Sequence, residues 1–563
     1  MRWKLKPLPE LHEIQALQAA GIKSEILASL FLQRNIRDFD TAREFCNPDL
    51  SALHDPFLMR DMDVAVNRVL QALNQNERIL VFGDYDVDGT TAVSLMYTYL
   101  ATKTTSVSHY IPDRYTEGYG VSKRGIDFAA DNDFTLIIAL DCGIKSVELV
   151  AYAKTLGIDF IICDHHLPGA IIPEAVAVLD PKRVDCAYPY KELCGCGVGF
   201  KLVQAIESKL ENDTDFVWSL LDFVAIAIAA DIVPLTGENR ILAYFGLELI
   251  NRDCRVGLKA LKQKSKKKVL DLEDLVFVFA PRINAAGRIN LGRDAVELMI
   301  ETDEQVAQSF ADAIESYNET RREFDQQTTV EALEQIRKNK EEEAPATVVF
   351  DAHWNKGVIG IVASRLIETH YRPTLVFTKS KGVYAASGRS VAGFDLYQAL
   401  EACQQHLVQF GGHTFAAGMT ILPENYIEFK KAFNAVVQEL RAPETLEPEI
   451  EIDMEIDIQR VSDNLVANYS RLGPFGPAHM KPVFLSKNVR IAASARTVGK
   501  DKSHLSFELE LDDQRKITAI AFKQGSRVDE ASGSVDVVYT INYNEFRDVR
   551  KLQLIVIDFR KSV

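Results

Sequence analysis

Between residues 60 and 250, short apolar runs alternate with longer segments of helical pattern, and this alternation constrains the fold more than any other feature. The runs are rich in Val, Ile and Leu and read RILVFG, VSHYIP, LIIAL, DFIIC and AVAVLD. Buried parallel strands joined by helices give this pattern, because both faces of such a sheet are covered. The sequence therefore predicts an open α/β sheet.

Acidic residues and histidines directly follow several apolar runs. They are Asp84, Asp86 and Asp88 after RILVFG, Asp141 after LIIAL, Asp164, His165 and His166 after DFIIC, and Asp231 after VAIAIAA. In an open parallel sheet, ligands bind beyond the carboxyl ends of the strands. We expect these four strand ends to meet at one edge and to form a cage of oxygen and nitrogen donors.

So many carboxylates in one place require cations, because like charges repel and unpaired buried charges are costly. Carboxylate-rich ligation with one or two imidazoles favours Mn²⁺ or Mg²⁺ over a structural zinc ion. One ion could not neutralise all these acids, so we predict two. For single pieces the alternatives are a calcium loop, which would need Glu where Leu95 stands, and a helix N-cap for Asp231.

Length and composition narrow the class of protein. The chain has 563 residues, more than one hydrophobic core usually supports, so we expect several domains. Its start has no apolar signal-peptide core and no apolar run is long enough to span a bilayer, which predicts a soluble, cytoplasmic protein with no membrane partner. The formal net charge of −16 argues against a polyanionic partner, but acids gathered around bound cations weaken that objection.

The eight cysteines are scattered, with one close group at Cys186, Cys194 and Cys196. A zinc site would want a second spaced pair or nearby histidines, and a disulfide framework would want a small secreted domain. We interpret these residues as reduced structural thiols, with a zinc site as the alternative.

Changes of pattern divide the chain into five parts. An N-terminal extension spans 1–55, the α/β part spans 56–300, and a segment without Gly or Pro at 301–343 predicts one long connecting helix, continuous or broken once. A second α/β part follows at 344–445. In the last part, 446–563, EIEIDMEIDI, HLSFELEL, KITAIAF and KLQLIVIDF alternate in hydrophobicity and predict antiparallel strands of a small barrel.

At these motifs the chain resembles a known family. GDYDVDG, DCG, DHH and ADIVPL are similar, in this order, to the four signatures of the DHH phosphoesterases. PRINAAGR at 281–288, SGRS at 387–390 and FGGHTFAAGM at 410–419 resemble the RecJ branch, the bacterial single-strand-specific exonucleases. The resemblance covers nearly the whole chain. It implies a DHH domain over 56–300, a DHHA1 domain over 344–445 and an OB-fold over 446–563.

The resemblance also implies an activity and a set of ligands. Members of the branch release nucleoside 5′-monophosphates from the 5′ end of single-stranded DNA in recombination and repair, using two Mn²⁺ or Mg²⁺ ions. The implied metal ligands are Asp84, Asp86, Asp88, Asp141, His165 and Asp231. Asp141 is the best candidate to bridge the ions, and whether Asp84 is a direct ligand stays open. Asp164 would orient a neighbouring histidine, and His166 would touch the scissile phosphate.

Residues of the second α/β part are expected to clamp the substrate. Ser387 and Arg389, together with Arg114, resemble the family's pocket for the 5′ phosphate, where a forked guanidinium suits a terminal phosphate. Asn284 and Arg288 are expected to line the same cleft. His413, after two glycines, would donate to a phosphate. The alternatives are a surface ion pair for Arg114, a structural turn for Asn284 and Arg288, and an ordinary turn at the glycines.

One segment departs from the family pattern. In LGPFGPAHMKPVF, Ala478, His479 and Met480 stand where relatives generally carry Gly-Asn-Pro. The difference leaves the expected barrel in place and concerns its detailed contacts with DNA.

Two other classes of function stay open beside the exonuclease. One is a DHH-type phosphodiesterase for very short RNAs or cyclic dinucleotides, but the OB-like C-terminal part argues against it. The other is a non-catalytic relative that only binds DNA, but the complete set of acidic residues argues against it. For the exonuclease we expect single-stranded DNA as the substrate, a helicase and a single-strand-binding protein as partners, and a monomer. The sequence does not decide which metal is used in the cell, or whether RNA is also degraded.

Overall fold

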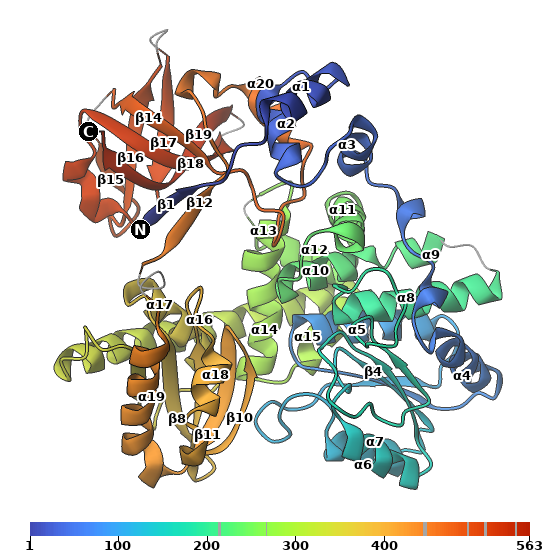
Figure 1. Cartoon of the computed structure of the whole chain (residues 1–563). Coiled ribbons are helices and arrows are strands. Elements are labelled where there is room, and N and C mark those ends of the chain that lie inside the picture. Colours follow the sequence, from blue (N-terminus) through green and yellow to red (C-terminus); the bar gives the residue numbers. More distant parts are fainter. Residues whose placement is uncertain are drawn as a thin grey trace. The chain divides into compact units, whose positions relative to one another are not determined.

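The structure is a computed structural model that describes residues 1–211, 215–265, 267–442, 447–492, 495–511, 515–546 and 549–562 (Figure 1). The chain forms two compact units. Unit 1 comprises Met1–Leu53, Pro234–Tyr244 and Glu449–Val563, and unit 2 comprises His54–Val233 and Phe245–Pro448. The predicted boundary between residues 445 and 446 lies outside the described residues. Within the described parts of the chain, no helix is both long and apolar enough to cross a membrane.

Unit 2 contains the predicted parallel sheet. Its strands are β2 (Ile79–Gly83), β3 (Val107–Tyr110), β4 (Leu136–Leu140), β5 (Asp159–Cys163) and β6 (Ala177–Leu179). They lie in the order β3-β2-β4-β5-β6, and every neighbouring pair is parallel. Figure 1 shows α5 (Val87–Ala101) and α8 (Gly195–Leu210) on one face and α6 (Lys123–Asp131) and α7 (Val147–Thr155) on the other. The prediction of an open α/β sheet is confirmed.

The strand order creates a switch point between β2 and β4. From β2 the chain crosses to β3 on one side, and the later strands build outward from β4 on the other side. Such a point leaves a crevice at the carboxyl ends of the two strands, where α/β proteins bind ligands. Gly83 pairs with Leu140, and Leu140 pairs with Cys163. Asp84, Asp141 and Asp164 therefore start from one level of the sheet edge.

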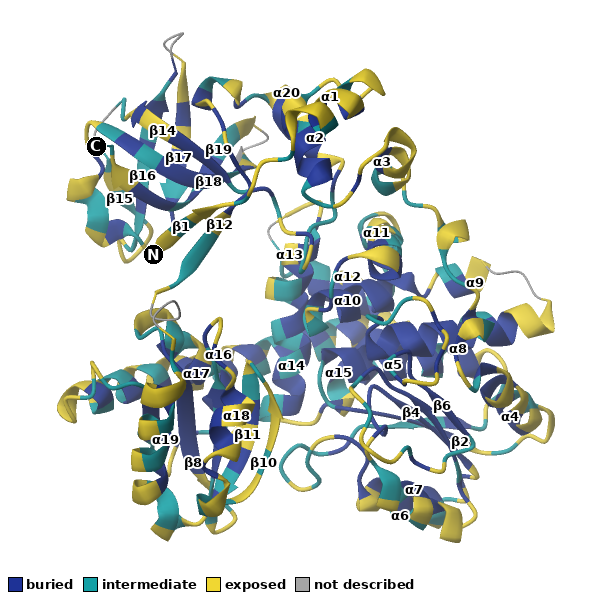
Figure 2. Cartoon of the chain, viewed as in Figure 1, coloured by how far each residue is buried: buried dark blue, intermediate teal, exposed yellow. Residues whose placement is uncertain are grey.

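The run VAIAIAA lies in a helix, so the prediction of a strand before Asp231 is wrong. The helix is α10 (Leu221–Asp231), and every residue of it from Leu221 to Ala229 is buried. A helix that is buried on all sides has no polar face, so its sequence lacks the helical period and looks like a buried strand. Figure 2 shows the buried helices of this region beside the buried sheet. Asp231 reaches the site from the end of this helix.

The connecting helix is continuous. It is α16 (Glu304–Lys338), with 35 residues, and Asp303 caps it by accepting hydrogen bonds from the backbone N–H groups of Gln305 and Val306. After it come β7 (Thr347–Phe350), β8 (Thr374–Ser380), β9 (Val383–Arg389), β10 (Leu407–His413) and β11 (Ala416–Ile421), in the order β10-β11-β9-β8-β7. Helices α17 (Ile359–Thr369), α18 (Leu396–Glu401) and α19 (Tyr426–Leu440) pack with this second sheet.

The remaining helices of unit 2 join or cover these layers. They are α4 (Met62–Asn74), α9 (Asp215–Trp218), α12 (Val256–Lys262), α13 (Leu272–Asp274), α14 (Ala280–Ile289) and α15 (Arg293–Ile300). Helix α11 (Gly237–Arg252) begins in unit 1 and ends in unit 2.

Unit 1 is built around a seven-stranded sheet. Its strands are β13 (Met454–Glu455), β14 (Phe484–Arg490), β15 (Arg496–Val498), β16 (His504–Glu510), β17 (Lys516–Ala521), β18 (Ser534–Phe546) and β19 (Val549–Lys561). They lie in the order β13-β14-β18-β19-β17-β16-β15. A bridge between Ile491 and Leu509 joins the end of β14 to β16, so the sheet curls into a barrel.

Not all of its strands are antiparallel, which corrects the prediction for the C-terminal part. β12 (Glu449–Ile452) lies outside the barrel and pairs in parallel with β1 (Arg2–Leu5), while β13 pairs in parallel with β14 and β17 with β19. Alternating hydrophobicity predicts a strand with one buried face but neither its partner nor its direction. Helices α1 (Leu11–Ala19), α2 (Glu25–Leu32), α3 (Phe39–Cys46) and α20 (Asp463–Ser470) belong to the same unit. The N-terminal residues therefore share the hydrophobic core of the barrel.

Candidate active site

Acids from β4, α5 and α10 gather around His165 at the switch point. Nε2 of His165 lies 3.3 Å from Oδ1 of Asp141, 3.5 Å from Oδ2 of Asp231 and 3.8 Å from Oδ2 of Asp88. Two sets of donor atoms, each within 4.8 Å of one another, could hold a cation: Asp141 with His165 and His166, and Asp88 with His165 and Asp231. Residues from distant parts of the sequence thus form one site, which we call the acidic cluster.

Asp84 and Asp86 lie beside the acidic cluster but in neither of those two sets. Asp84 is fully buried, and its Oδ1 accepts a hydrogen bond of 3.1 Å from the backbone N–H of Gly120. Asp86 caps α5 by accepting a hydrogen bond of 3.1 Å from the N–H of Gly89. The negative charge of Asp86 contributes to the raised pKa of Asp84 and of Asp141, so Asp86 interacts electrostatically with both carboxyl groups.

The first turn of α8 holds Asp88 in place. Oδ2 of Asp88 accepts a hydrogen bond of 2.6 Å from the N–H of Gly195, and Oδ1 accepts one of 2.8 Å from the N–H of Cys196. A helix N-terminus stabilises negative charge through its free N–H groups and its dipole. Our interpretation of the CGCG segment as structural thiols missed this role; glycines at the start of a helix were the available signal.

Gly195 also allows α8 to approach Asp141 closely. A side-chain carbon on Gly195 would lie 2.5 Å from Cβ of Asp141 and 2.7 Å from its Cα. Asp141 itself has a φ of +58°, in the left-handed region that few residues other than glycine adopt. Strained backbone of this kind concentrates at functional sites, where the surrounding structure enforces it. The strained residue is thus the one whose carboxylate lies 3.3 Å from Nε2 of His165.

The acidic cluster has the properties of a cation site. Among the described residues in the acidic cluster and directly beside it, four buried polar atoms have no hydrogen-bond partner, namely Asp84 Oδ2, Asp141 Oδ1, His165 Nδ1 and His165 Nε2. Leaving buried polar atoms unpaired costs free energy, which a bound cation would recover. Carboxylate oxygens with one or two imidazoles suit Mn²⁺ or Mg²⁺. The residues present therefore fit the predicted divalent ions.

Burial and neighbouring charges also shift the pKa values of the acids and of His165 at this site. Burial and the charge of Asp86 raise the pKa of Asp84 to about 8, and burial with Asp86 raises that of Asp88 to about 7. The pKa values of Asp141 and Asp231 are raised well above the ordinary value by desolvation and by the charges of their neighbours, Asp88 first. Burial and the charge of His166 lower the pKa of His165 to about 3. His165 is therefore neutral, as a metal ligand must be.

Asp164 orients His166 and keeps it charged. Oδ1 of Asp164 accepts a hydrogen bond of 2.8 Å from Nδ1 of His166, and Oδ2 accepts one of 2.9 Å from the N–H of Ile144. Burial alone would lower the pKa of His166, but the hydrogen bond and charge of Asp164 raise it to about 9. The ring is thus a cation 4.0 Å from Asp141, and a charged donor suits a phosphoryl oxygen.

A second group of side chains, the arginine cluster, comprises Arg114, Arg288 and Arg389. The guanidinium of Arg114 stacks 4.2 Å above the ring of Tyr85. Nη1 of Arg288 donates to the carbonyl oxygen of Gly357 at 2.7 Å, and Nη1 of Arg389 donates to Oγ of Ser387 at 3.1 Å.

The neighbouring arginines act on Arg288. Burial first, and then the charges of Arg114, Arg321 and Arg389, together lower the pKa of Arg288 to about 9. Positive charges gathered in this way favour an anion between them. Arg321 belongs to α16, a helix for which the sequence predicted no chemistry.

Asn284 and His413 lie at different distances from this cluster. Asn284 is half-buried on α14, four residues before Arg288 and hence about one turn away. His413 is exposed at the end of β10. His413 pairs with Ala416, and Ala416 pairs in turn with Arg389. His413 and Arg389 are therefore two strand spacings apart, roughly 10 Å in total.

Two tyrosines connect the arginine cluster with the acidic cluster. The ring of Tyr85, under Arg114, meets the ring of Tyr119 edge-on with centroids 6.0 Å apart. The hydroxyl of Tyr119 lies 3.2 Å from Nε2 of His166, within hydrogen-bond distance. Neither tyrosine was predicted from the sequence, although both stand inside the motifs GDYDVDG and EGYG. The two clusters therefore form one continuous site.

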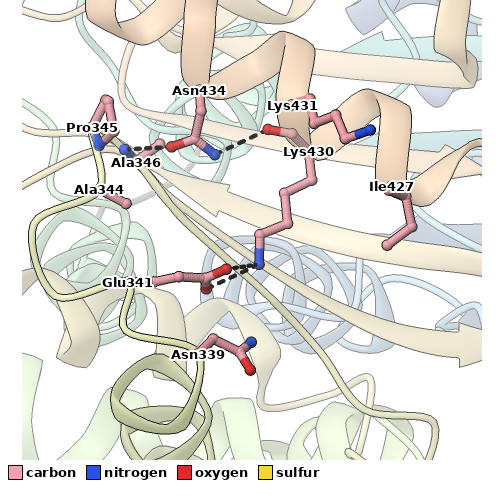
Figure 3. A pocket seen from close by; sticks show the side chains of 9 residues that line it. All are labelled: Asn339, Glu341, Ala344, Pro345, Ala346, Ile427, Lys430, Lys431 and Asn434. Atoms are coloured by element: carbon pink, nitrogen blue, oxygen red, sulfur yellow. Dashed lines mark hydrogen bonds and ion pairs between the residues drawn. The ribbon is translucent and has the colours of Figure 1, made fainter.

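A hollow at the end of α16 is separate from this site (Figure 3). Several of its polar groups pair with one another: Nζ of Lys430 lies 2.7 Å from Oε1 of Glu341, and Asn434 bonds the N–H of Ala346 and the carbonyl oxygen of Lys430. None of its lining residues belongs to the acidic or the arginine cluster. We assign it no chemistry.

Comparison with known proteins agrees with the geometry of the site. Residues 78–228 match the DHH family, N-terminal domain, residues 343–439 match the DHHA1 domain, and residues 452–558 match the RecJ OB domain. The fold and the site thus define a metal-dependent phosphoesterase of the DHH class.

Within that class the chain belongs to the RecJ family. It is 35% identical to the single-stranded-DNA-specific exonuclease RecJ of Bacillus subtilis, over 99% of this chain and 70% of that protein. The crystal structure of Thermus thermophilus RecJ in complex with Mn²⁺ matches it with a TM-score of 0.86 at 26% identity, covering 100% of this chain and 80% of the other. The Mg²⁺ complex of the same protein matches with a TM-score of 0.80 at 26% identity, covering 100% and 79%.

Proposed function

We propose that this chain is an exonuclease that degrades single-stranded DNA from the 5′ end and releases nucleoside 5′-monophosphates. The observation that carries the proposal is the continuity of the site: Arg114, Tyr85, Tyr119 and His166 lead from the arginine cluster to the acidic cluster. A strand whose terminal phosphate is bound by the arginines would present a following phosphodiester to the acids. This arrangement would give the cleavage its direction.

The residues of the acidic cluster and those beside it would have separate roles in the reaction. The metal ligands would be Asp84, Asp86, Asp88, Asp141, His165 and Asp231, and Asp141 would be the best candidate to serve both ions. When bound, two divalent cations lower the pKa of the attacking water and stabilise the attacking and leaving oxygens. His166, charged and oriented by Asp164, would donate to the phosphoryl oxygen on which charge builds.

Arg114, Arg389 and Ser387 would hold the 5′ phosphate, since a guanidinium fork matches its oxygens. Arg288 and Asn284 would line the same cleft, and His413 would contact a phosphate farther along. We also propose that the protein works as a monomer in the cytoplasm, on strands exposed by a helicase and presented by a single-strand-binding protein. A dimer in analytical ultracentrifugation would contradict the monomer.

An end-labelling experiment tests the proposed activity. Oligonucleotides labelled at the 5′ or the 3′ end are incubated with Mn²⁺, Mg²⁺ or a chelator. We expect labelled mononucleotide at once from the 5′-labelled strand with either metal, and no product with the chelator. Asp141→Ala should be inactive but should keep the circular dichroism spectrum of the wild type.

Two outcomes would contradict the proposal. Early release of mononucleotide from the 3′-labelled strand would reverse the polarity. Equal degradation of a blunt duplex would remove the single-strand specificity.

A further inference from the structure

The loop between β3 and α6 reaches the arginine cluster. It comprises residues 111–122, all in unit 2, and we call it the site loop. It carries Arg114, and the hydroxyl of its next residue, Tyr115, donates a hydrogen bond to the backbone carbonyl oxygen of Arg288. Two successive residues thus bring the site loop into contact with the arginine cluster.

The far end of the same loop reaches the acidic cluster and its neighbour Asp84. The hydroxyl of Tyr119 lies 3.2 Å from Nε2 of His166, and the backbone N–H of Gly120 donates a hydrogen bond of 3.1 Å to Oδ1 of Asp84. Gly120 has a φ of +78°, which glycine adopts without steric cost. Whatever holds the site loop in shape therefore places groups at both clusters.

Glu117 lies between these two ends of the site loop and bonds to both of its roots. Its Oε1 accepts a hydrogen bond of 2.9 Å from the backbone N–H of Asp113. Its Oε2 accepts one of 2.9 Å from the hydroxyl of Tyr110, the last residue of β3, and one of 2.6 Å from the hydroxyl of Ser122, which caps α6. A single carboxylate thus joins the end of the strand, the start of the loop and the start of the next helix.

Asp113 fixes only the first turn of the site loop. Its Oδ1 accepts hydrogen bonds from the backbone N–H groups of Tyr115 (2.9 Å) and Thr116 (2.7 Å), and its carbonyl oxygen accepts one of 2.9 Å from the N–H of Glu117. Aspartate side chains commonly hold turns in this way. The partners of Asp113 lie two to four residues away, whereas those of Glu117 span the loop from residue 110 to residue 122. Glu117 is therefore the residue that closes the loop as a whole.

We propose that Glu117 is a positioning residue for catalysis: by closing the site loop, it sets Arg114 and Tyr119 in place together. Binding of the terminal phosphate and orientation of His166 then depend on one carboxylate that belongs to neither cluster. The inference rests on the proposed function, because Arg114 and His166 matter only if a 5′-phosphorylated strand is cleaved at this site. A displacement of about 1 Å in groups that position a substrate can lower the rate about 100-fold.

Two substitutions test the hydrogen bonds of Glu117. Glu117→Ala removes all three, whereas Glu117→Gln can keep them, because its carbonyl oxygen accepts from Asp113 and its amide donates to the two hydroxyls. Rates with Mn²⁺ give kcat and KM for a 5′-phosphorylated and a 5′-hydroxyl strand. We expect Glu117→Ala to lose kcat about tenfold on both strands, since Tyr119 no longer meets His166, and a further tenfold in kcat/KM, roughly, on the phosphorylated strand alone, since Arg114 is displaced. Glu117→Gln should recover most of both losses.

Asp127→Ala is the matched control. The carboxylate of Asp127, on α6, also accepts a hydrogen bond from a tyrosine hydroxyl, that of Tyr152, at 2.7 Å. Its partners Tyr152 and Lys123 lie outside the site loop and outside both clusters. Asp127→Ala should therefore keep the kinetic constants of the wild type on both strands.

A second measurement follows the site loop without metal or catalysis. Hydrogen–deuterium exchange of the full-length protein in a chelator is read by mass spectrometry on the peptide that covers residues 111–122. We expect exchange about tenfold faster or more in Glu117→Ala, because three hydrogen bonds that close the loop are lost, and wild-type exchange in Asp127→Ala. Tyr110→Phe, which removes one of the three hydrogen bonds and keeps the ring, should show the same pattern more weakly, and it replaces Glu117→Ala if that variant does not fold.

Wild-type kinetics or wild-type exchange in Glu117→Ala would overturn the inference. So would equal losses on the two strands, because Arg114 would then not depend on Glu117. A wild type that hydrolyses no DNA, or that does not distinguish the phosphorylated strand, would instead overturn the proposed function. The exchange of residues 111–122 would still show whether Glu117 closes the site loop.

Discussion

Replacing Gly195 with alanine tests whether the close approach of α8 to Asp141 builds the metal site. The new methyl carbon would lie 2.5 Å from Cβ and 2.7 Å from both Cα and Oδ1 of Asp141. Contacts between such carbons are normally near 3.5 Å or longer, so the overlap is about 1 Å. Neither partner can yield without damage, because Asp141 has a constrained backbone and the N–H of Gly195 donates to Asp88.

The overlap should lower both the free energy of unfolding and the activity, by different amounts. Overpacking of this kind costs about 1–3 kcal/mol of the free energy of unfolding. A displacement of about 1 Å in a catalytic group can lower activity about 100-fold, and disturbed ligand positions lower metal affinity about 10- to 100-fold. We therefore expect Gly195→Ala to lose far more activity than stability.

Gly197→Ala is the matched control in the same helix. Its new methyl carbon would lie 3.5 Å from Cδ2 of Leu193 and 3.6 Å from Sγ of Cys194, which are ordinary contacts. Alanine is the better helix former by about 0.5–1 kcal/mol, so this variant should be as stable as the wild type or slightly more stable.

The assays are denaturant unfolding in a chelator, Mn²⁺ titration of the metal-free protein, and exonuclease rate at saturating Mn²⁺. Wild-type Mn²⁺ affinity and rate in Gly195→Ala would refute the reasoning. Equal losses in Gly197→Ala would also refute it, because the cause would then be the start of α8 in general and not its contact with Asp141.

Three further predictions concern pH and the arginine cluster. Without divalent ions, the free energy of unfolding should fall as pH rises from about 4 to 8, because the raised pKa values of Asp84 (about 8) and Asp88 (about 7) mean that the folded chain keeps protons that the unfolded chain loses near pH 4. Saturating Mn²⁺ should flatten this slope in denaturant melts, and equal slopes with and without the ion would contradict the site. Burial lowers the pKa of His479 to about 4. The free energy of unfolding of the wild type should therefore fall by up to roughly 3 kcal/mol relative to that of His479→Asn as pH falls from about 6.5 to 4. Parallel stability curves would disprove this. Arg389→Lys should raise KM about tenfold for a 5′-phosphorylated strand and leave a 5′-hydroxyl strand unchanged, since a single ammonium cannot replace the fork; an equal rise for both strands would place Arg389 elsewhere on the DNA.

The sheet and most of the acidic cluster could be predicted because their signals are local. A buried strand is a continuous apolar run, and the residue after it must lie at the edge of the sheet, as Asp141 does after β4. The sequence could predict Asp231 as a member of the site, but not that it ends a helix instead of a strand. Helix α10 is buried on all sides, so the period that separates helix from strand is absent from its sequence.

Other features depend on contacts between distant segments, which one sequence does not contain. The role of Gly195 follows from Asp141, 54 positions earlier, and the role of Tyr119 follows from His166. In unit 1, Nη2 of Arg240 donates to the carbonyl oxygens of Phe45 and Leu472, so three regions that are far apart in the chain meet there. His479 is buried in the same unit, and this could not be predicted either, because a histidine in a loop carries no sign of burial.

Helix α16 limits how the lengths of related chains can differ. Each residue of a helix adds about 1.5 Å and a turn of about 100°, so deleting one residue within 304–338 would rotate everything that follows. The buried carboxylate of Asp325, 2.7 Å from Nε of Arg365 on α17, would then face another side. Alignments of relatives should accordingly carry their insertions and deletions in the loops on either side of this helix and hardly ever inside it.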